Sequence, residues 1–238
     1  MERQKYVVIM AAGSGTRMGE KIPKQFLELG GKAILRRTIE VFLAADPQVK
    51  VIVVLPPDHI PYWREYCYKN SFICPQVLVK GGITRFHSVK NALAKVPDGA
   101  VVAIHDGVRP LVSETLVREL FAKASKAPAV IPVIPMVDTL KALSVKEWTD
   151  SGKSYIPLPD MHIDRSHVFG AQTPQVFHSE LLKSAYAQPY DTSFTDDASV
   201  VENMGTSPVY VPGEKFNIKI TTKDDLDFAK AVLLMRAR

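Results

Sequence analysis

A short polar stretch with two glycines, an arginine and a lysine follows directly on an apolar run. The apolar residues YVVI (6–9) are followed by MAAGSGTRMGEKIPKQF, which carries Gly13, Gly15, Arg17 and Lys24. Small residues allow backbone N–H groups to turn toward an anion, and the arginine and lysine can bond phosphate oxygens. The stretch therefore indicates a loop that binds a phosphate group at the end of a strand.

The loop differs from the two best-known phosphate-binding motifs. A dinucleotide-binding loop has a third glycine where this chain has Met18, and a P-loop has serine or threonine after Gly-Lys, where this chain has Ala33. The missing glycine disfavours a dinucleotide-dependent oxidoreductase. Spacing alone leaves a second interpretation open, in which the stretch is a plain strand-to-helix turn with two solvated cations.

Two further segments place charged or small residues just after expected strands. In HDGVRP, Asp106 suits a magnesium ion or a substrate hydroxyl and Arg109 suits a phosphate, although Asp106 could instead cap the next turn. In GGITRFHSV, Gly81 and Gly82 let the backbone approach a flat base. Arg85 in the same segment is either an ion-pair partner or a cation at the start of a helix.

Two other ionisable side chains allow more than one interpretation. His105 ends the apolar run AVVAIH, so we expect it to be a structural partner rather than a general base. Lys219 alternates with Ile218 and Ile220 on an expected strand, and such a lysine can bind phosphate or simply face the solvent. The sequence offers no convincing pair of nucleophile and general base.

Short β-branched runs alternate with segments of helical period, and these elements must position the loops. Strands that are apolar on both faces and separated by helices predict a parallel sheet covered on both sides, with ligands beyond the carboxyl ends of the strands. We therefore predict an α/β fold with a Rossmann-like, mostly parallel sheet and helices on both faces. The expected strands are 6–10, 49–55, 75–79, 100–105, 129–135, 207–211 and 216–221, and the expected helices are 34–45, 58–69, 85–95, 113–125, 178–187, 195–203 and 223–236.

Residues 136–163 interrupt this alternation. They consist of two extended segments around the polar turn TDSGK at 149–153, which predicts a projecting β-hairpin arm. A long hairpin without a covering helix tends to find a partner, so we expect the arm to form the contact of a homodimer. No interdomain linker is evident, and we predict that residues 1–238 form a single domain that includes the arm.

The composition is that of an ordinary globular chain. It has 238 residues, of which 46% are hydrophobic and 23% are charged, with a net charge of +5. The basic residues are scattered and no aromatic platform lies among them, which disfavours a nucleic-acid-binding protein. We expect no signal peptide and no membrane span, and the cysteines Cys67 and Cys74 indicate a reducing compartment, so we predict a cytoplasmic protein.

Taken together, the motifs resemble those of a known family. AAGSGTRMG with PKQF is similar to the nucleotidylyltransferases that activate sugars and polyols. It is followed, in order, by GGITRFHSV, HDGVRP, DTLK, DRSHVFGAQTPQVF, TDDASVVE and NIKITTKDDL. From the first strand to the last helix, the set resembles the cytidylyltransferases that act on 2-C-methyl-D-erythritol 4-phosphate in the non-mevalonate route to isoprenoids.

The resemblance implies a reaction and a set of site residues. A phosphate oxygen of the acceptor would attack the α-phosphorus of CTP and expel pyrophosphate, with Mg²⁺ present and Asp106 as its candidate ligand. CTP would contact Ala11, Ala12, Gly13, Gly15, Gly81, Gly82 and Ser88. The catalytic residues would be Arg17, Lys24, Arg165 and Lys219, and the acceptor, a polyol phosphate, would contact Asp106, Arg109, Thr139, Thr173 and Thr195.

The resemblance leaves the acceptor and one base contact open. Ribitol 5-phosphate is the alternative acceptor, because GEKFNIKITT is shared with the enzymes that use it, whereas RFHSV, DRSHVFGAQTPQ and TDDAS favour 2-C-methyl-D-erythritol 4-phosphate. Relatives often have an acidic or polar residue in place of Ile83, so recognition there would fall to the main chain. In the family, the threonine and arginine that match Thr139 and Arg165 reach the substrate from the neighbouring subunit's arm.

Overall fold

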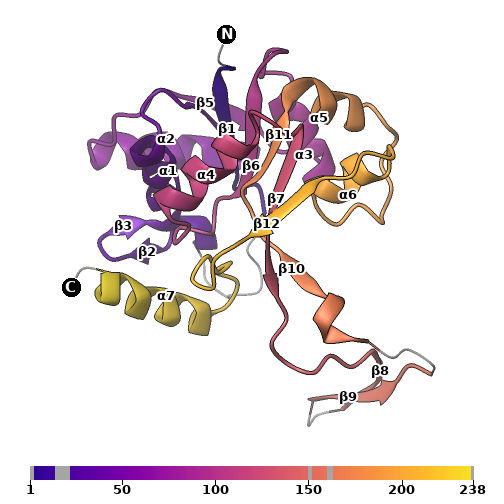
Figure 1. The fold of residues 1–238 in the computed structure, drawn as a ribbon. Helices are drawn as coiled ribbons and strands as arrows, with labels where there is room; N and C mark the ends of the chain where they lie inside the picture. The colour runs from indigo at the N-terminus through magenta and orange to yellow at the C-terminus, as the bar shows by residue number, and fades with distance from the viewer. Residues whose placement is uncertain (1–2, 14–21, 150–151, 160–162, 237–238) are drawn as a thin grey trace.

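A mixed, mostly parallel sheet forms the centre of the molecule (Figure 1). The computed structural model describes residues 3–13, 22–149, 152–159 and 163–236. Within these residues the sheet has eight strands in the order β10-β7-β11-β6-β1-β4-β5, with β12 paired to β7. The parallel half consists of β5 (Gln76–Lys80), β4 (Lys50–Leu55), β1 (Lys5–Met10) and β6 (Val101–Asp106). The prediction of a mostly parallel sheet is confirmed.

The other half of the sheet contains strands that the sequence pattern does not predict. β11 (Gln175–His178) lies antiparallel between β6 and β7 (Ala129–Pro135), and β10 (Phe169–Ala171) is antiparallel to β7. β12 (Val209–Pro212) is parallel to β7, close to the expected strand 207–211. β10 and β11 are too short for a periodic signal, so pairing with β7 and β6 decides their conformation rather than their local sequence.

Alternation along β1 explains why both faces of the sheet are covered. Val7 and Ile9 pack in one cluster and Val8 packs in the opposite one, because successive strand side chains point to opposite faces. The helices that bury side chains in the first cluster are α1 (Ile34–Ala45), α2 (Ile60–Lys69) and α4 (Glu114–Lys123). The helices in the second cluster are α3 (Arg85–Leu93), α5 (Ser179–Ala185) and α6 (Asp197–Glu202).

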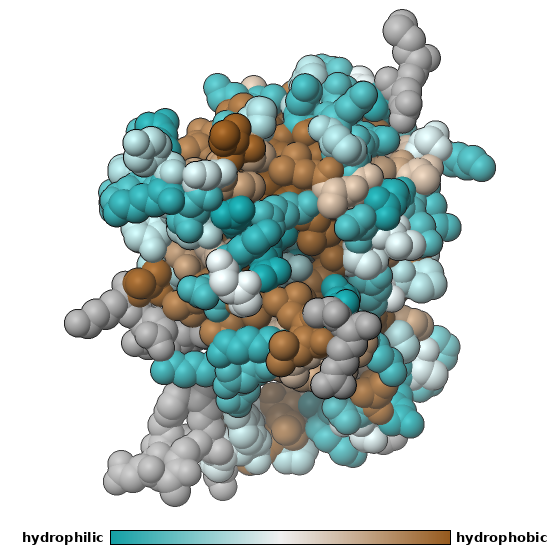
Figure 2. All heavy atoms as spheres, turned by 90° about the vertical axis from the view of Figure 1, so that its left-hand side faces the viewer, coloured by the Kyte–Doolittle hydropathy of each residue, from teal (hydrophilic) through white to brown (hydrophobic). Residues whose placement is uncertain are grey.

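The last helix, α7 (Lys223–Arg236), packs beside the small hairpin of β2 (Glu28–Leu29) and β3 (Lys32–Ala33) (Figure 1). Its buried residues Ala229 and Val232 join Leu29, Val108 and Ile220 in a third cluster. On the face of the molecule at the left of Figure 1, hydrophilic and hydrophobic residues are interleaved (Figure 2).

The expected strand 216–221 is wrong. All six residues are described, and none of them pairs in a sheet. Ile220 is buried in the third cluster and its N–H donates to the Val108 carbonyl (2.9 Å), so the apolar alternation reflects packing against a loop. The segment instead crosses beyond the strand ends, where side-chain bonds hold it.

The predicted hairpin arm is present and points away from the body of the molecule (Figure 1). β8 (Leu143–Thr149) and β9 (Gly152–Pro157) pair antiparallel as a separate two-stranded sheet. Apolar side chains of the arm are exposed, namely Leu143, Val145, Tyr155, Ile156 and Leu158. Among the helices described for this chain, none has the length and apolar character that crossing a membrane requires.

Candidate active site

A cavity of about 430 Å³ opens at the carboxyl ends of β1 and β6. Met10 and Asp106, which end these two parallel strands, are register partners and both line the cavity. Ligands of parallel sheets bind at this edge. The predicted site residues that line the cavity are Ala11, Ala12, Gly13, Lys24, Gly82, Ser88, Asp106 and Lys219.

The glycine-containing loop is the stretch of residues 11–24 that follows β1. Its described part is held by hydrogen bonds from two sides. The Ala11 N–H donates to the Val54 carbonyl (2.9 Å), and the buried Gln25 side-chain amide donates to the Ala11 carbonyl (2.9 Å). Gln25 belongs to the short 3₁₀ helix η2 (Lys24–Phe26), so this bond also keeps the preceding lysine beside the loop. The predicted residues Gly15 and Arg17 lie outside the described residues.

Close packing requires the glycines of the second loop. A Cβ atom on Gly81 would lie 2.7 Å from the Cβ of Ala12, and one on Gly82 would lie 2.5 Å from the Cβ of His87. Gly81 does not itself line the cavity but lets the two loops approach each other. The pair therefore brings β5 and the start of α3 against the glycine-containing loop.

Ser88 fixes the shape of this second loop. Its hydroxyl oxygen accepts a hydrogen bond from the Gly82 N–H (2.9 Å), and the hydroxyl donates one to the Thr84 carbonyl (2.9 Å). The Thr84 hydroxyl caps α3 by accepting from the His87 N–H. Ile83, which is 96% exposed, also lines the cavity, so an apolar side chain lies at its rim.

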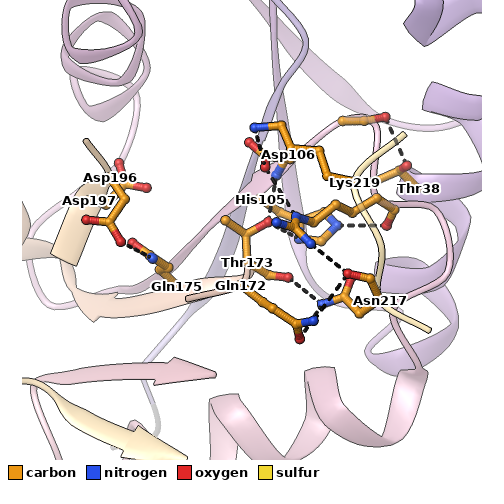
Figure 3. Close-up of polar contacts among 12 residues, drawn as sticks. Thr38, His105, Asp106, Gln172, Thr173, Gln175, Asp196, Asp197, Asn217 and Lys219 are labelled. Atoms are coloured by element: carbon orange, nitrogen blue, oxygen red, sulfur yellow. Dashed lines mark hydrogen bonds and ion pairs between the residues drawn. The ribbon is translucent and has the colours of Figure 1, made fainter. Parts of the chain in front are cut away.

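Asp106 lies between two cations beside the cavity (Figure 3). Its Oδ2 atom is 3.0 Å from Lys219 Nζ and 3.3 Å from Arg109 Nε, and the residue is only 8% exposed. Burial alone would raise the pKa of Asp106, but the positive charges of Lys219, Arg85 and Arg109 outweigh it and hold the pKa far below its usual range. Asp106 is therefore a carboxylate at neutral pH and accepts hydrogen bonds.

His105 is a structural partner, as the sequence predicts. Its Nε2 atom is 3.1 Å from the Arg109 carbonyl oxygen and its Nδ1 atom is 3.0 Å from Thr173 Oγ1. Nε2 must then carry the proton, so the Thr173 hydroxyl donates to Nδ1 while it accepts from the Asp106 N–H (3.0 Å). Burial lowers the pKa of His105 to about 4, which keeps the ring neutral.

Arg85 is the ion-pair partner of Asp197, which decides between its two interpretations. Its Nη1 atom is 2.9 Å from Asp197 Oδ1, its Nη2 atom contacts Oδ2, and the Tyr186 hydroxyl donates to Oδ1 (2.6 Å). The Asp197 side chain is fully buried, whereas that of Arg85 is 32% exposed and lines the cavity. Burial would lower the pKa of Arg85, but the charge of Asp197 outweighs it and raises that pKa.

The remaining predicted residues lie outside the cavity wall. Arg109 donates to the Asp106 carboxylate, and the Thr173 hydroxyl accepts from the Asp106 N–H. Thr139 follows β7 at the root of the arm, and Arg165, in the 3₁₀ helix η4 (Arg165–His167), donates to the Val137 carbonyl (2.7 Å) there. Thr195 directly precedes Asp196, the N-cap residue of α6. The side chains of Thr139, Arg165 and Thr195 are exposed.

Sequence reasoning did not single out three buried polar side chains at this site. Gln25 supports the first loop, Asp197 anchors Arg85, and Asn217 holds the segment before Lys219. Each is no more than 2% exposed. They lie within PKQF, TDDAS and NIK, but hydrophobic periodicity does not distinguish a buried amide or carboxylate from a surface one.

Among the described residues that line the cavity, Asp106 offers a magnesium ion the one carboxylate. Across the described part of the chain no group of three or more His, Cys, Asp or Glu side chains has the arrangement of a metal site. Magnesium commonly takes one or two carboxylates and completes its shell with phosphate oxygens and water. Asp106 fits this pattern as a partial site, in which its contacts with Lys219 and Arg109 would compete with the ion.

Known proteins resemble this chain over almost its whole length. The profile of the family described as "IspD: 2-C-methyl-D-erythritol 4-phosphate cytidylyltransferase" matches residues 6–235. Proteins of that name from Bacteroides fragilis and Phocaeicola vulgatus are 46% and 45% identical, over 95% and 96% of this chain and 98% and 99% of their own lengths.

Solved structures agree with the sequence comparison. The 4-diphosphocytidyl-2C-methyl-D-erythritol synthase of Anaerococcus prevotii superposes with a TM-score of 0.78 at 29% identity. The superposition covers 98% of this chain and 100% of the chain of that synthase. The 2-C-methyl-D-erythritol 4-phosphate cytidylyltransferase of Thermus thermophilus superposes with a TM-score of 0.70 at 30% identity, over 97% and 98% of the two chains. The chain therefore belongs to the 2-C-methyl-D-erythritol 4-phosphate cytidylyltransferase family.

Proposed function

We propose that the cavity binds CTP and that the chain transfers its cytidylyl group to 2-C-methyl-D-erythritol 4-phosphate, giving 4-diphosphocytidyl-2-C-methyl-D-erythritol and pyrophosphate. One observation carries this assignment to the cavity. Lys24, Asp106 and Lys219 line a single cavity whose other walls are the glycine-containing loop and the loop of Gly82. Both substrates are polyanions, and this arrangement offers cations together with backbone that a flat base can approach.

The reaction needs alignment and charge stabilisation more than proton transfer. An acceptor phosphate oxygen forms a bond to the α-phosphorus of CTP while the bond from that phosphorus to the β-phosphate oxygen breaks, and the electron pair leaves with pyrophosphate. We assign Lys24 and Arg17 to the triphosphate, where Lys24 opposes the charge that develops on the α-phosphoryl oxygens. We assign Lys219 and Arg165 to the acceptor phosphate.

We assign the two substrate subsites to residues that line the cavity and to residues that lie outside its wall. Ala11, Ala12, Gly13, Gly15, Gly81, Gly82 and Ser88 would contact CTP, largely through the backbone. Asp106 would accept from an acceptor hydroxyl, with Arg109, Thr139, Thr173 and Thr195 completing the acceptor side. Magnesium would supply positive charge to the triphosphate. Asp106 and the phosphate oxygens of CTP would hold the ion.

We further propose a homodimer in which each arm reaches the other subunit. An apolar groove of about 1030 Å³ lies at the root of the arm, lined by residues that include Ile134, Val137, Phe169 and Tyr210. The groove is continuous with the arm, whose apolar residues are exposed. Thr139 and Arg165 lie at the same root and would then complete the partner's site. Free Cys67 and Cys74 suit the cytoplasmic location that we also propose.

Pyrophosphate release tests the proposed reaction. The purified chain would receive CTP and Mg²⁺ with either 2-C-methyl-D-erythritol 4-phosphate or ribitol 5-phosphate. Release with the first acceptor alone supports the proposal, and release with the second alone would overturn the assigned acceptor. Light scattering at the assay concentration tests the dimer, since a single monomeric mass would refute it, and Phe169→Asp is expected to shift a dimer toward monomer.

A further inference from the structure

The segment that carries Lys219 is held by few backbone bonds. Residues 216–221 are not part of the sheet, although their apolar alternation resembles a strand. Within the described residues, the segment's backbone hydrogen bonds are Ile220 N–H to the Val108 carbonyl (2.9 Å) and Asn217 N–H to the Glu214 carbonyl (3.1 Å). The position of Lys219 must therefore depend on side chains that bind the segment.

Asn217 makes most of these side-chain bonds, and it is fully buried. Its Nδ2 atom donates to the Thr173 carbonyl (2.8 Å) and to Gln172 Oε1 (3.3 Å). Its backbone carbonyl accepts from Arg109 Nη1 (2.6 Å) and from Gln172 Nε2 (3.4 Å). Figure 3 shows the Asn217 amide directed at Gln172 and Thr173. Both the side chain and the main chain of Asn217 are thus tied to the body of the protein.

Arg109 joins this anchor to the site carboxylate. The same guanidinium contacts Asp106 Oδ2 through Nε (3.3 Å) and the Asn217 carbonyl through Nη1 (2.6 Å). Two residues after Asn217, Lys219 places its Nζ atom 3.0 Å from the same Oδ2 atom. The contacts form a closed ring of Asp106, Arg109, Asn217 and Lys219. The Arg109 side chain is only 13% exposed, in keeping with this inward role.

We propose that Asn217 is a positioning residue for the transfer reaction and that it acts by holding Lys219 against Asp106. The inference rests on the proposed function, because it takes the region around Lys219 as the place of the acceptor phosphate. Lys24, Gly82 and Ser88 are not members of the ring, so loss of the Asn217 side chain displaces Lys219 on the acceptor side and leaves these CTP contacts in place. Displacement of a positioning group by about 1 Å can cost on the order of 100-fold in rate.

Steady-state kinetics of Asn217→Ala test this role with CTP and 2-C-methyl-D-erythritol 4-phosphate. We expect kcat/KM for the acceptor to fall by about 10- to 100-fold, while KM for CTP changes less than about twofold. Asn217→Ser, which retains a short donor for the Thr173 carbonyl, is expected to recover part of the loss and also serves if the alanine variant fails to fold. The proposal would be overturned by an unchanged kcat/KM for the acceptor. It would also be overturned if KM rose by the same factor for CTP and for the acceptor.

A double-mutant cycle with Lys219→Met separates positioning from general destabilisation. If Asn217 acts through Lys219, its replacement costs little further activity once the lysine is gone, because residues that act as a unit are not additive. Additive losses would contradict the inference. Ser179→Ala is the matched control, since it removes a buried hydroxyl that accepts from the Ala100 N–H (3.1 Å). Ala100 directly precedes the first residue of β6, whereas Asp106 is the last. We expect it to lower Tm without changing either KM.

The wild-type assay distinguishes this inference from the proposed function. A wild-type chain that releases no pyrophosphate with either acceptor would refute the proposed function itself. An active wild type with an equally active Asn217→Ala variant would refute the positioning role and leave the proposed function standing.

Discussion

Replacement of Arg85 by methionine is the most informative test of the electrostatics beside the cavity. Methionine keeps much of the apolar stem of the side chain but removes the guanidinium. The Asp197 carboxylate, which is 0% exposed, then retains the Tyr186 hydroxyl (2.6 Å) as a hydrogen-bond donor but loses its charged partner. Arg85 itself is 32% exposed, so the two partners are not equivalent. Removal of the arginine should therefore destabilise the fold more than Asp197→Asn does.

The expected loss of stability follows from leaving the buried Asp197 carboxylate without its charged partner. Removing one partner of a buried pair typically costs about 3–5 kcal/mol of unfolding free energy. We therefore expect Arg85→Met to lose about 3–5 kcal/mol of unfolding free energy at pH 7.

Urea unfolding of the wild type and of Arg85→Met at pH 7 provides the assay. Arg118→Met is the matched control, since Arg118 pairs with Glu114 on the surface at half exposure and should cost less than about 1 kcal/mol. A loss below that value for Arg85→Met would refute the reasoning.

Three further predictions concern Lys24, the buried His105 and Gly81, which lies between the two loops. Lys24→Met should lower kcat by about two to three orders of magnitude in the pyrophosphate assay, as loss of a preorganised donor does, and a wild-type kcat would remove Lys24 from the mechanism. The pKa of His105 is lowered to about 4 by burial, so between pH 6.5 and 4 the unfolded chain binds more protons and stability falls as the pH falls. His105→Gln should remove up to about 3 kcal/mol of that fall in urea unfolding, whereas parallel curves for the two proteins would contradict the assignment. Gly81→Ala places a Cβ atom 2.7 Å from Ala12 and should raise KM for CTP about tenfold, whereas Gly170→Ala, with its nearest contact at 3.6 Å, should leave KM unchanged.

The parallel core and its helices could be predicted because their signals are local and repeated. β1 and β4 are apolar on both faces, and the helix after β5 has a clear start at the Thr84 cap of α3. The same pattern predicts chemistry at the strand ends, where Asp106 and the glycine-containing loop meet. These features follow from side-chain periodicity and from the rule that ligands of parallel sheets bind at the carboxyl edge.

The short strands and the support of the site could not be predicted from the sequence. β10 and β11 have three and four residues, too few for a period, and their conformation depends on partners far away in the chain. The segment around Lys219 has the alternation of a strand but is held by Gln172, Asn217 and Arg109 instead. Whether an apolar residue of such a segment faces a sheet neighbour or a loop is decided by tertiary packing.

By itself, the sequence determined the α/β fold, the hairpin arm, the edge of the sheet to search for a site and the family, because these depend on residue types and their order along the chain. The tertiary structure alone decided which charges meet. It pairs Arg85 with Asp197, 112 positions apart, and it places Lys219 3.0 Å from Asp106. Coulombic interactions and desolvation depend on distance and burial, and neither quantity is written in the spacing of residues along the chain.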